Sequence, residues 1–480
     1  MIPASIDRAS ARLFWLFSIL LLGTGLLAVY TENYYLLGVP PLLLFFYLSA
    51  VNFRFIFFLM MATIPLSVEV QFGQTLGTDL PTEPLIAGLM LVCFFYVMGR
   101  SSHIDRNFLK HPLTTLLLLH FFWCLVSTIF SSDLLVSVKN ATAKLWYITV
   151  FYFLAAMIVR SLRDFKIIFW CFLIPLLFTI VYTLVRHSKH HFTFDTVNTM
   201  MDPFYRNHVN YAVVLALFIP FVFAALQWYH SRNVRLFLIG AIGLILLGVL
   251  LSYTRATWLA LAAAVLFRWV LKRKLVLPVF IVIFIAMLGG LFYLMRDNKY
   301  LDLAPDYKKT IMHVRFDEHL ASTTHLQDIS SAERVYRWIA GFRMWESNPV
   351  TGFGPGNFYN FYKSYTVFKF RTYVSDNKER STVHNYFLLM LVEQGMVGLL
   401  LFIALTIGLF YWGQRIYHAT VGREYRALTL SLNLSIFSIY THLMVNDLVE
   451  TVKIGTMLFL FIALLVNQDL RNRRLLKEQP

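Results

Sequence analysis

The sequence predicts an all-α polytopic membrane protein with about fourteen transmembrane helices (12–14). Of its 480 residues, 58% are hydrophobic and only 14% are charged, whereas apolar residues make up roughly half of a typical globular chain. Many apolar runs reach the ~20 residues that a helix needs to cross a hydrocarbon core of ~30 Å. Most charged residues lie between these runs. The composition therefore excludes an ordinary soluble enzyme.

The apolar runs define the predicted spans in chain order. The first run begins at Leu13, is long enough to span, and is not followed by a small-residue cleavage pattern, so we expect it to be a retained helix. The later runs are separated by short polar or basic segments, which is typical of multi-pass proteins. The predicted spans are 13–31, 35–51, 54–70, 84–99, 112–130, 146–160, 167–186, 210–229, 236–253, 256–271, 275–295, 385–411, 427–446 and 453–467.

The distribution of basic residues predicts the orientation of these spans. With both termini in the cytoplasm, 22 of the 42 Lys and Arg residues fall in short inner segments and only seven in short outer loops. The other thirteen lie in one long outer loop, to which the positive-inside rule does not apply. The net charge of +16 forms no single patch, so no nucleic-acid partner is expected. The three cysteines fall inside predicted spans, which favours inert thiols over disulfides or metal ligands.

The chain divides into three predicted parts. Residues 1–295 hold transmembrane helices 1–11, residues 296–384 form an outer loop domain, and residues 385–480 hold helices 12–14 and a basic cytoplasmic tail. Within the loop domain, the stretch AERVYRWIAGFRMWES has apolar residues at helical spacing, through Val335, Ile339 and Phe342, and predicts an amphipathic helix. The stretch NPVTGFGPGNF then ends this helix with proline and turn glycines.

Four arginines on the predicted outer side are candidates for binding an anion. They are Arg206, Arg255, Arg334 and Arg337, the last one turn beyond Arg334 on the same helix face. A guanidinium can bind phosphate oxygens through two parallel hydrogen bonds, so several that face one cavity would hold a diphosphate without a metal ion. Each arginine also has a simpler interpretation, as a side chain that reaches the lipid headgroups.

His384 begins the last long apolar stretch, at the predicted boundary between water and membrane. One interpretation is a residue at a helix boundary that bonds to a nearby carbonyl. The other is a catalytic base, because histidine is the side chain best suited to accept a proton near neutral pH. Its place at the membrane surface is where a lipid-linked substrate would present its head.

The stretch HNYFLLMLVEQGMVG resembles the signature of the O-antigen ligase/polymerase family: His, then Asn, Ser or Gln, nine residues, Gly, two residues and Gly. Upstream, ERVYRWIAGFRMWESNPVTGFGPGNF resembles the Arg-x-x-x-Trp … Pro-x-x-Gly-x-Gly segment of this family, and FYRNHVNYA and SYTRATWLA resemble its two other arginine-bearing stretches. The residues that fill the family positions are His384, Asn385, Gly395, Gly398, Arg334, Trp338, Pro349, Gly352, Gly354, Arg206 and Arg255.

The resemblance implies a membrane-embedded GT-C-type glycosyltransferase of the bacterial inner membrane, inverting and independent of metals or other cofactors. Its donor would be a glycan on undecaprenyl diphosphate, bound by Arg206, Arg255 and Arg334 at the periplasmic face. His384 would activate the acceptor hydroxyl as the base. Arg337, Asn385 and Trp338 would support the site.

Several alternatives stay open. A ligase would transfer the glycan to lipid A–core, whereas a polymerase would use a second lipid-linked glycan. A flippase for lipid-linked oligosaccharides is less favoured, because few charges lie deep within the spans. The stretch HSKHHFTFD matches no standard metal-ligand spacing. Glu393 is expected to bond to a neighbouring helix, and Asp447 and Glu450 could orient an arginine or His384 or simply lie at the outer surface.

Overall fold

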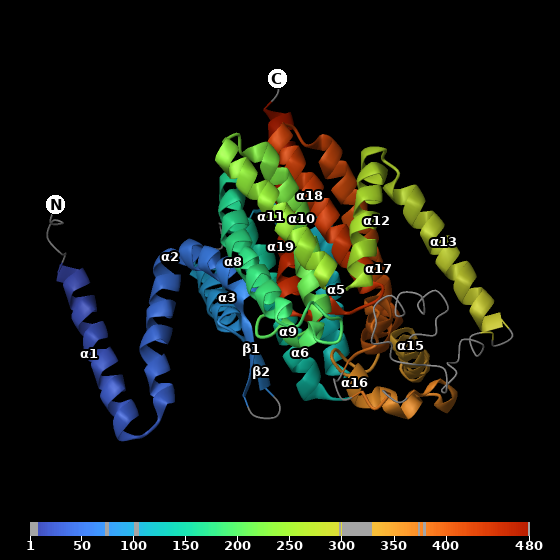
Figure 1. Ribbon diagram of the computed structural model, residues 1–480, viewed down its shortest axis with the longest axis horizontal. Coiled ribbons are helices and arrows are strands. Elements are labelled where there is room, and N and C mark those ends of the chain that lie inside the picture. The colour runs from blue at the N-terminus through green and yellow to red at the C-terminus, as the bar shows by residue number, and fades with distance from the viewer. Residues whose placement is uncertain are drawn as a thin grey trace.

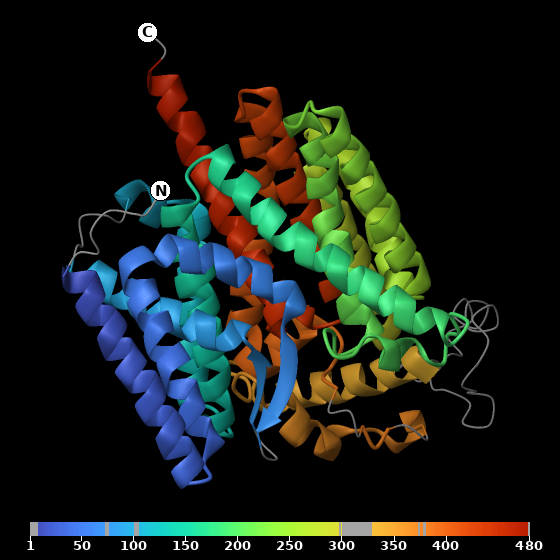
Figure 2. The same ribbon diagram turned by 60° about the vertical axis from the view of Figure 1, so that its left-hand side comes forward.

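The computed structural model describes residues 8–72, 76–99, 105–296, 299, 329–372, 375–377 and 381–478. These residues form a bundle of long helices, with the shorter helices α15 (Ile329–Ser347) and α16 (Phe358–Phe361) at one end (Figure 1). We call this the loop end. The last residues of the chain lie at the other end, the C-terminal end (Figure 1). Figure 2 shows the N-terminal helices along one side of the bundle.

The long helices follow the predicted spans in chain order. They are α1 (Arg8–Tyr30), α2 (Val39–Leu66), α3 (Thr82–Gly99), α5 (Pro112–Ile129), α6 (Leu134–Tyr147), α8 (Leu162–Ser188), α10 (His208–Trp228), α11 (Arg232–Leu251), α12 (Arg255–Lys272), α13 (Val276–Met295), α17 (Tyr386–Ala419), α18 (Arg423–Leu443) and α19 (Val452–Lys477). The short segments are η1 (Tyr34–Gly38), α4 (Arg106–Leu109), a π-helical segment η3 (Ile148–Leu154), α7 (Ala155–Ile158), α9 (Val197–Met200), η5 (Tyr362–Tyr365), η6 (Phe368–Phe370) and η7 (Leu448–Glu450).

Polar residues just before the apolar runs determine where several helices begin. Asp133, Asn207 and Asn385 each accept the backbone N–H three residues further on. Ser161 and Asp164 form a reciprocal capping box at the start of α8. Such caps satisfy N–H groups that have no partner inside the helix. The helix starts are therefore encoded locally.

Eight helices within the described residues are long and apolar enough to cross a membrane. Three shorter apolar helices, Val51–Leu66, Thr82–Val97 and Val276–Met287, add to them. The predicted class, a helical multi-pass membrane protein, is therefore confirmed. The predicted number of fourteen spans is not confirmed.

The main differences lie near the N-terminus. The predicted spans 35–51 and 54–70 correspond to the two halves of α2, which the non-helical backbone of Asn52 separates (φ −143°, ψ 68°), but the first half begins only at Val39. The second of them also ends too late, because residues 68–72 form strand β1 (Val68–Phe72), which pairs antiparallel with β2 (Leu76–Leu80). The residues of β1 alternate between apolar and polar, and this period of two favours a strand. The all-α prediction therefore missed one hairpin.

Helix α18 carries several buried polar residues and packs inside the bundle against α10, α12, α17 and α19. Ser431 and Ser435 donate hydrogen bonds to backbone carbonyls of α10 at 2.8 and 2.6 Å. Small polar residues allow helices in a membrane to approach closely and bond to each other. The polar residues of α18 thus join it to α10.

The predicted amphipathic helix of the loop domain is α15. Its buried face, however, is formed by Ala332, Tyr336, Ala340 and Met344, whereas the predicted face through Val335, Ile339 and Phe342 is partly exposed. Val335 and Ile339 are partly buried and pack against the core, whereas Phe342 is exposed. Much of the predicted loop domain (297–298, 300–328, 373–374 and 378–380) lies outside the described residues.

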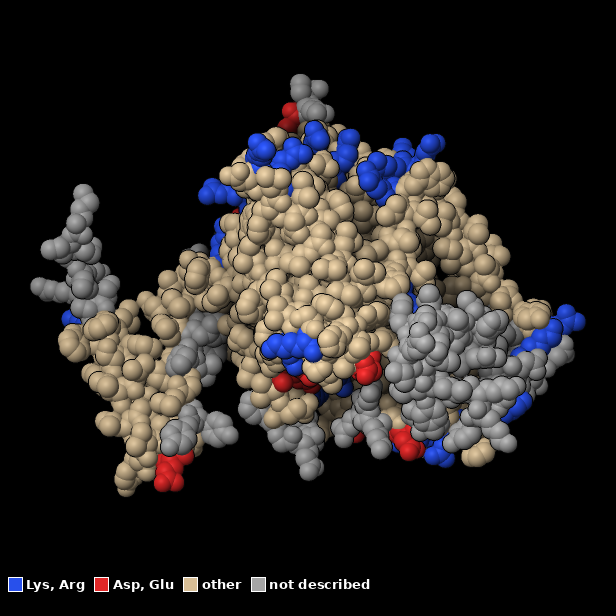
Figure 3. Space-filling model, in the orientation of Figure 1, with Lys and Arg blue, Asp and Glu red and all other residues tan. Residues whose placement is uncertain are grey.

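Lysine and arginine side chains gather at the C-terminal end of the bundle (Figure 3). This end includes the last turns of α12 and α19, where the basic stretches 268–274 and 471–477 lie. The loop end shows a mixture of acidic and basic side chains (Figure 3). The two ends of the bundle thus differ in charge.

Candidate active site

His384 lies in an extended segment at the loop end, residues 381–385, which we call the strap. The Trp338 indole and the Arg337 guanidinium donate to the carbonyls of Val383 and Thr382, at 3.0 and 3.3 Å. On the other side, the Asn385 amide donates to a carbonyl of the loop after α18, at 3.1 Å. The strap is therefore held between α15 and that loop.

The backbone of His384 adopts a left-handed conformation, with φ of 53°, which is uncommon for a residue other than glycine. One side of the imidazole bonds to the Asn446 side chain. The Nδ1 atom is buried and has no hydrogen-bond partner among the described residues. The hydrogen-bonding capacity of this nitrogen is therefore unused within the described residues.

Burial, together with the positive charges of Arg337 and Arg334, lowers the pKa of His384 to about 3. Both effects disfavour the protonated imidazole, so His384 is neutral near pH 7 without a substrate. A neutral imidazole is the form that accepts a proton.

Two neighbouring turns of α15 place Arg334 and Arg337 close enough to His384 to affect its charge. Arg337 is buried and pairs with Glu333 at 3.4 Å. The Glu333 carboxylate also accepts hydrogen bonds from the hydroxyls of Thr372 and Ser375. The Glu333 carboxylate offsets the positive charge of Arg337, so the role of Arg337 beside His384 is structural.

Arg206 and Arg255 come from other parts of the chain. Arg206 lies near the carboxyl group of Asp447. Burial raises the pKa of Asp447, while the positive charge of Arg206 acts in the opposite direction. Arg255 begins α12, and Thr254 just before it donates to the His208 carbonyl at 3.4 Å. This bond places the start of α12 beside the segment that follows Arg206. The convergence of all these guanidiniums on one ligand stays a prediction.

Comparison with known protein families gives one match. Residues 240–403 match the O-antigen ligase family. This segment of the chain is similar to the O-antigen ligases, a family of membrane enzymes. No curated protein matches it. The matched O-antigen ligase segment includes Arg255, Arg334 and the strap, whereas Arg206 and Asp447 lie outside it.

The motif glycines of the O-antigen ligase segment join two parts of the chain. Helix α17 is broken at Gly395, where φ is 68°. A side chain at Gly395 would collide with the carbonyl of Val350, and one at Gly352, where φ is 69°, would collide with the backbone of Glu393. Only glycine combines this φ with so close an approach at low cost. Gly395 thus allows a loop to dock on a helix break.

The break in α17 exposes backbone carbonyls that the docked loop and α5 satisfy. The N–H groups of Phe353 and Gly354 bond to the carbonyls of Val392 and Glu393 at 3.0 and 2.8 Å. The Trp123 indole of α5 donates to the next carbonyl, that of Gln394, at 2.8 Å. Buried backbone groups must be paired, and these bonds hold the first half of α17 below the strap.

The Glu393 side chain, in the same O-antigen ligase segment, is buried and accepts backbone N–H groups of Gly356 and Phe358 at 2.8 and 3.2 Å. Its partners are the glycine-rich loop and the first residue of the short helix α16, so the predicted bond to a neighbouring helix is confirmed only in part. Its role is to hold that loop.

Sequence reasoning missed Asn446 and did not decide the role of Asp447. Both lie in the stretch VNDLVET, whose density of polar residues between two apolar runs was the available signal. Of the histidines in the stretch HSKHHFTFD, His187 bonds to the carbonyl of Thr193 at 3.0 Å. The described residues contain no group of three or more His, Cys, Asp and Glu side chains that could hold a metal ion.

Replacing Arg337 with glutamine should shift the acid limb of the pH dependence of kcat/KM to higher pH, by roughly one pH unit. Removing this positive charge favours the protonated imidazole and so raises the pKa of His384, which Arg337 now helps to lower. The shift would be measured by comparing the pH dependence of kcat/KM for the wild type and the Arg337→Gln variant with the same donor. Any ionisation of the substrate affects both proteins equally and so cancels in this comparison.

Arg343, an exposed arginine on the same helix, provides the control: Arg343→Gln should leave the limb unchanged. Identical limbs for the wild type and the Arg337 variant would show that Arg337 does not act on the catalytic ionisation.

Proposed function

We propose that the protein is an O-antigen ligase-type glycosyltransferase. It moves a glycan from undecaprenyl diphosphate to a hydroxyl group of lipid A–core at the periplasmic face of the inner membrane. The observation that carries this proposal is the unpartnered, buried Nδ1 of His384 beside two arginines, in a segment of the O-antigen ligase family.

In the proposed reaction, His384 takes the proton of the acceptor hydroxyl while its oxygen bonds to the anomeric carbon of the donor. The bond from this carbon to the diphosphate breaks on the opposite face, which inverts the configuration. A sugar hydroxyl is a poor nucleophile until a base removes its proton as the new bond forms. No metal ion takes part in this scheme.

The diphosphate leaves with the electron pair of the broken bond. Arg206, Arg255 and Arg334 stabilise its negative charge, because fixed guanidiniums act strongly in a site with little water. The bound diphosphate also offsets the positive charges around the imidazole, and this raises the proton affinity of His384 when the donor is in place. The base thereby becomes stronger only in the loaded enzyme.

The proposed roles of the supporting residues follow from their contacts. Trp338 and Arg337 hold the strap carbonyls, and Asn385 caps α17 while it bonds to the loop after α18. The Asn446 side chain orients the ring of His384 from the same loop. Asp447 compensates the charge of Arg206.

The glycan profile of a deletion strain tests the ligase assignment. We expect the strain to lose all polymer linked to lipid A and to accumulate polymer on the lipid carrier. A strain that retains a single capped repeat unit on lipid A would instead identify a polymerase, whose acceptor is a second lipid-linked glycan. Restoring the wild-type gene should reverse either defect.

The proposed topology predicts opposite accessibilities for the two ends of the bundle. With Cys93, Cys124 and Cys171 replaced by alanine, a cysteine at the exposed Asp376 should react with an impermeant maleimide from the periplasm. A cysteine at the exposed Leu476 should react only after the inner membrane is disrupted. Labelling of both positions from the periplasm would refute this topology, and labelling of neither would refute the exposure at the loop end.

A further inference from the structure

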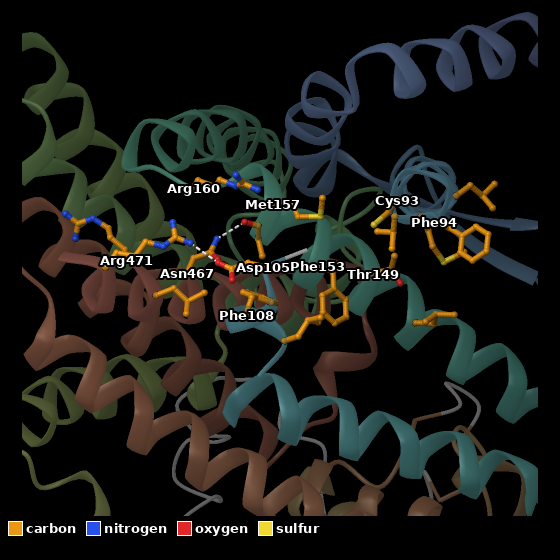
Figure 4. Close-up of a pocket in the computed structure, with 18 of the residues that line it drawn as sticks. Cys93, Phe94, Asp105, Phe108, Thr149, Phe153, Met157, Arg160, Asn467 and Arg471 are labelled. Carbon is orange, nitrogen blue, oxygen red and sulfur yellow. Dashed lines mark hydrogen bonds and ion pairs between the residues drawn. The ribbon is translucent and has the colours of Figure 1, made fainter. Parts of the chain in front are cut away.

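A cavity of about 970 Å³ lies near the C-terminal end of the bundle, between α3, the α6–η3–α7 segment and α19 (Figure 4). Asn467, one of its lining residues, is fifteen residues beyond Val452, where α19 begins near the candidate active site. At 1.5 Å per residue this separation is about 22 Å along the helix. The cavity is therefore separate from the strap and His384.

The larger part of the cavity is apolar. Phe108, Phe153 and Met157 lie along its walls (Figure 4). Leu91 and Phe94 of α3 also line it and are 44% and 57% exposed. Exposed apolar side chains on a membrane helix face hydrocarbon, so the cavity opens sideways to the lipid. Its ligand is thus expected to come from the bilayer.

The other part of the cavity is polar and basic. Arg160, Asn467 and Arg471 lie together on one side of it (Figure 4). The Asn467 amide donates to the carbonyls of Ala156 and Val159, both at 2.9 Å. These two carbonyls lie at the end of α7, so the amide fixes the helix end that presents Arg160.

The two arginines at this polar part are not neutralised by a carboxylate in the described structure. The Arg471 guanidinium stacks on the Tyr425 ring at 3.5 Å, and its Nη1 atom is buried without a hydrogen-bond partner. Arg160 is exposed, and the hydrogen bond it makes to Asp164 uses its backbone N–H. In contrast, Arg474 pairs with Asp105 at 2.8 Å. The cavity thus combines an apolar interior with two available cations.

We propose that this cavity binds an anionic glycerophospholipid of the adjacent leaflet. An acyl chain fills the apolar part, and the phosphate contacts Arg160 and Arg471. Basic pockets between transmembrane helices bind anionic lipid headgroups, and guanidiniums suit phosphate oxygens. The volume falls within the range of about 300–1,000 Å³ that is usual for ligand pockets. This proposal does not depend on the glycosyltransferase mechanism.

Native mass spectrometry of the purified full-length protein tests the proposal. The probes are phosphatidylglycerol and phosphatidylcholine with identical acyl chains, added at equal concentrations. We expect one phosphatidylglycerol to be retained preferentially. Arg160→Gln and Arg471→Gln should each lower its affinity about fivefold, as expected for one cation near a lipid phosphate. Thr149→Trp, which fills the cavity, should abolish retention of this lipid.

Matched controls separate this site from general lipid binding. Arg423→Gln removes an exposed arginine at the same end, and Leu246→Trp enlarges a lipid-facing residue of α11; neither lines the cavity, and both should retain the lipid. Equal melting temperatures of all variants exclude unfolding as the cause of any loss. For a variant that melts lower, retention is measured at a temperature at which it stays folded.

Three results would overturn the proposal. Equal retention of the two lipids would remove the role of the headgroup. A second such result has two parts: inorganic phosphate at millimolar concentration displaces the lipid, and the Thr149→Trp variant still binds phosphate. Together they would identify a site for free anions. Retention that no cavity variant changes would mean that the lipid binds elsewhere on the protein.

Discussion

Replacing His384 with glutamine should lower the rate of glycan transfer by about 10²-fold or more, as expected when a general base is removed. Glutamine keeps a hydrogen-bonding group near the Asn446 side chain, but it cannot accept the proton of the acceptor hydroxyl. The His384→Ala variant should fail equally. Both should still bind the donor, because the guanidiniums that hold the diphosphate are unchanged. Transfer and donor binding would be measured with purified enzyme and a lipid-linked donor.

The matched control is His190→Gln, which changes an exposed histidine of the α8–α9 loop and should leave the rate unchanged. A His384→Gln variant that transfers glycan at nearly the wild-type rate would contradict the proposed base. His384 would then only position the acceptor.

Replacing Arg206, Arg255 or Arg334 with alanine should weaken donor binding about 30-fold or more, which corresponds to losing one partner of a buried charge pair. Lysine should restore little of this loss, because a single ammonium group cannot form two parallel bonds to the phosphate oxygens. Donor affinity would be measured on inactive His384→Ala protein, so that turnover does not interfere.

The exposed Arg343, on the same helix as Arg334, is again the control, and Arg343→Ala should bind the donor normally. Full recovery by lysine at all three positions would show that only the charge matters. Guanidiniums more than about 15 Å apart in a donor-bound structure could not share one diphosphate through direct bonds near 3 Å, and the predicted clamp would be abandoned.

Some features of this protein depend on short stretches of sequence and could be predicted from them. Apolar runs predicted nearly all the long helices. A segment that crosses a bilayer must satisfy its backbone hydrogen bonds without water, and a helix does this within the segment itself. Residues such as Asn207 and Asn385 begin helices through bonds to their own next turn. The spaced residues from Arg334 to Gly398 allowed the family to be recognised, and the family comparison confirmed it for residues 240–403.

The tertiary structure alone decided which residues meet at His384. Asn446 lies 62 positions further along the chain, yet its side chain bonds to the imidazole. Likewise, the Glu393 carboxylate holds the loop at Gly356 and Phe358. The sequence spacing between such partners carries no information on their distance, because the contact depends on how α15, α17 and α18 pack.

The same reason explains the buried face of α15 and the role of Gly395. Ala332 and Ala340 are buried, although larger apolar residues lie on the same helix, because α15 packs against α17, η5 and η6. Gly395 is required because a loop forty-five positions earlier in the chain, at Val350, contacts its backbone. Local sequence determines which segments become helices, whereas the chemical setting of each side chain depends on neighbours that only the folded chain provides.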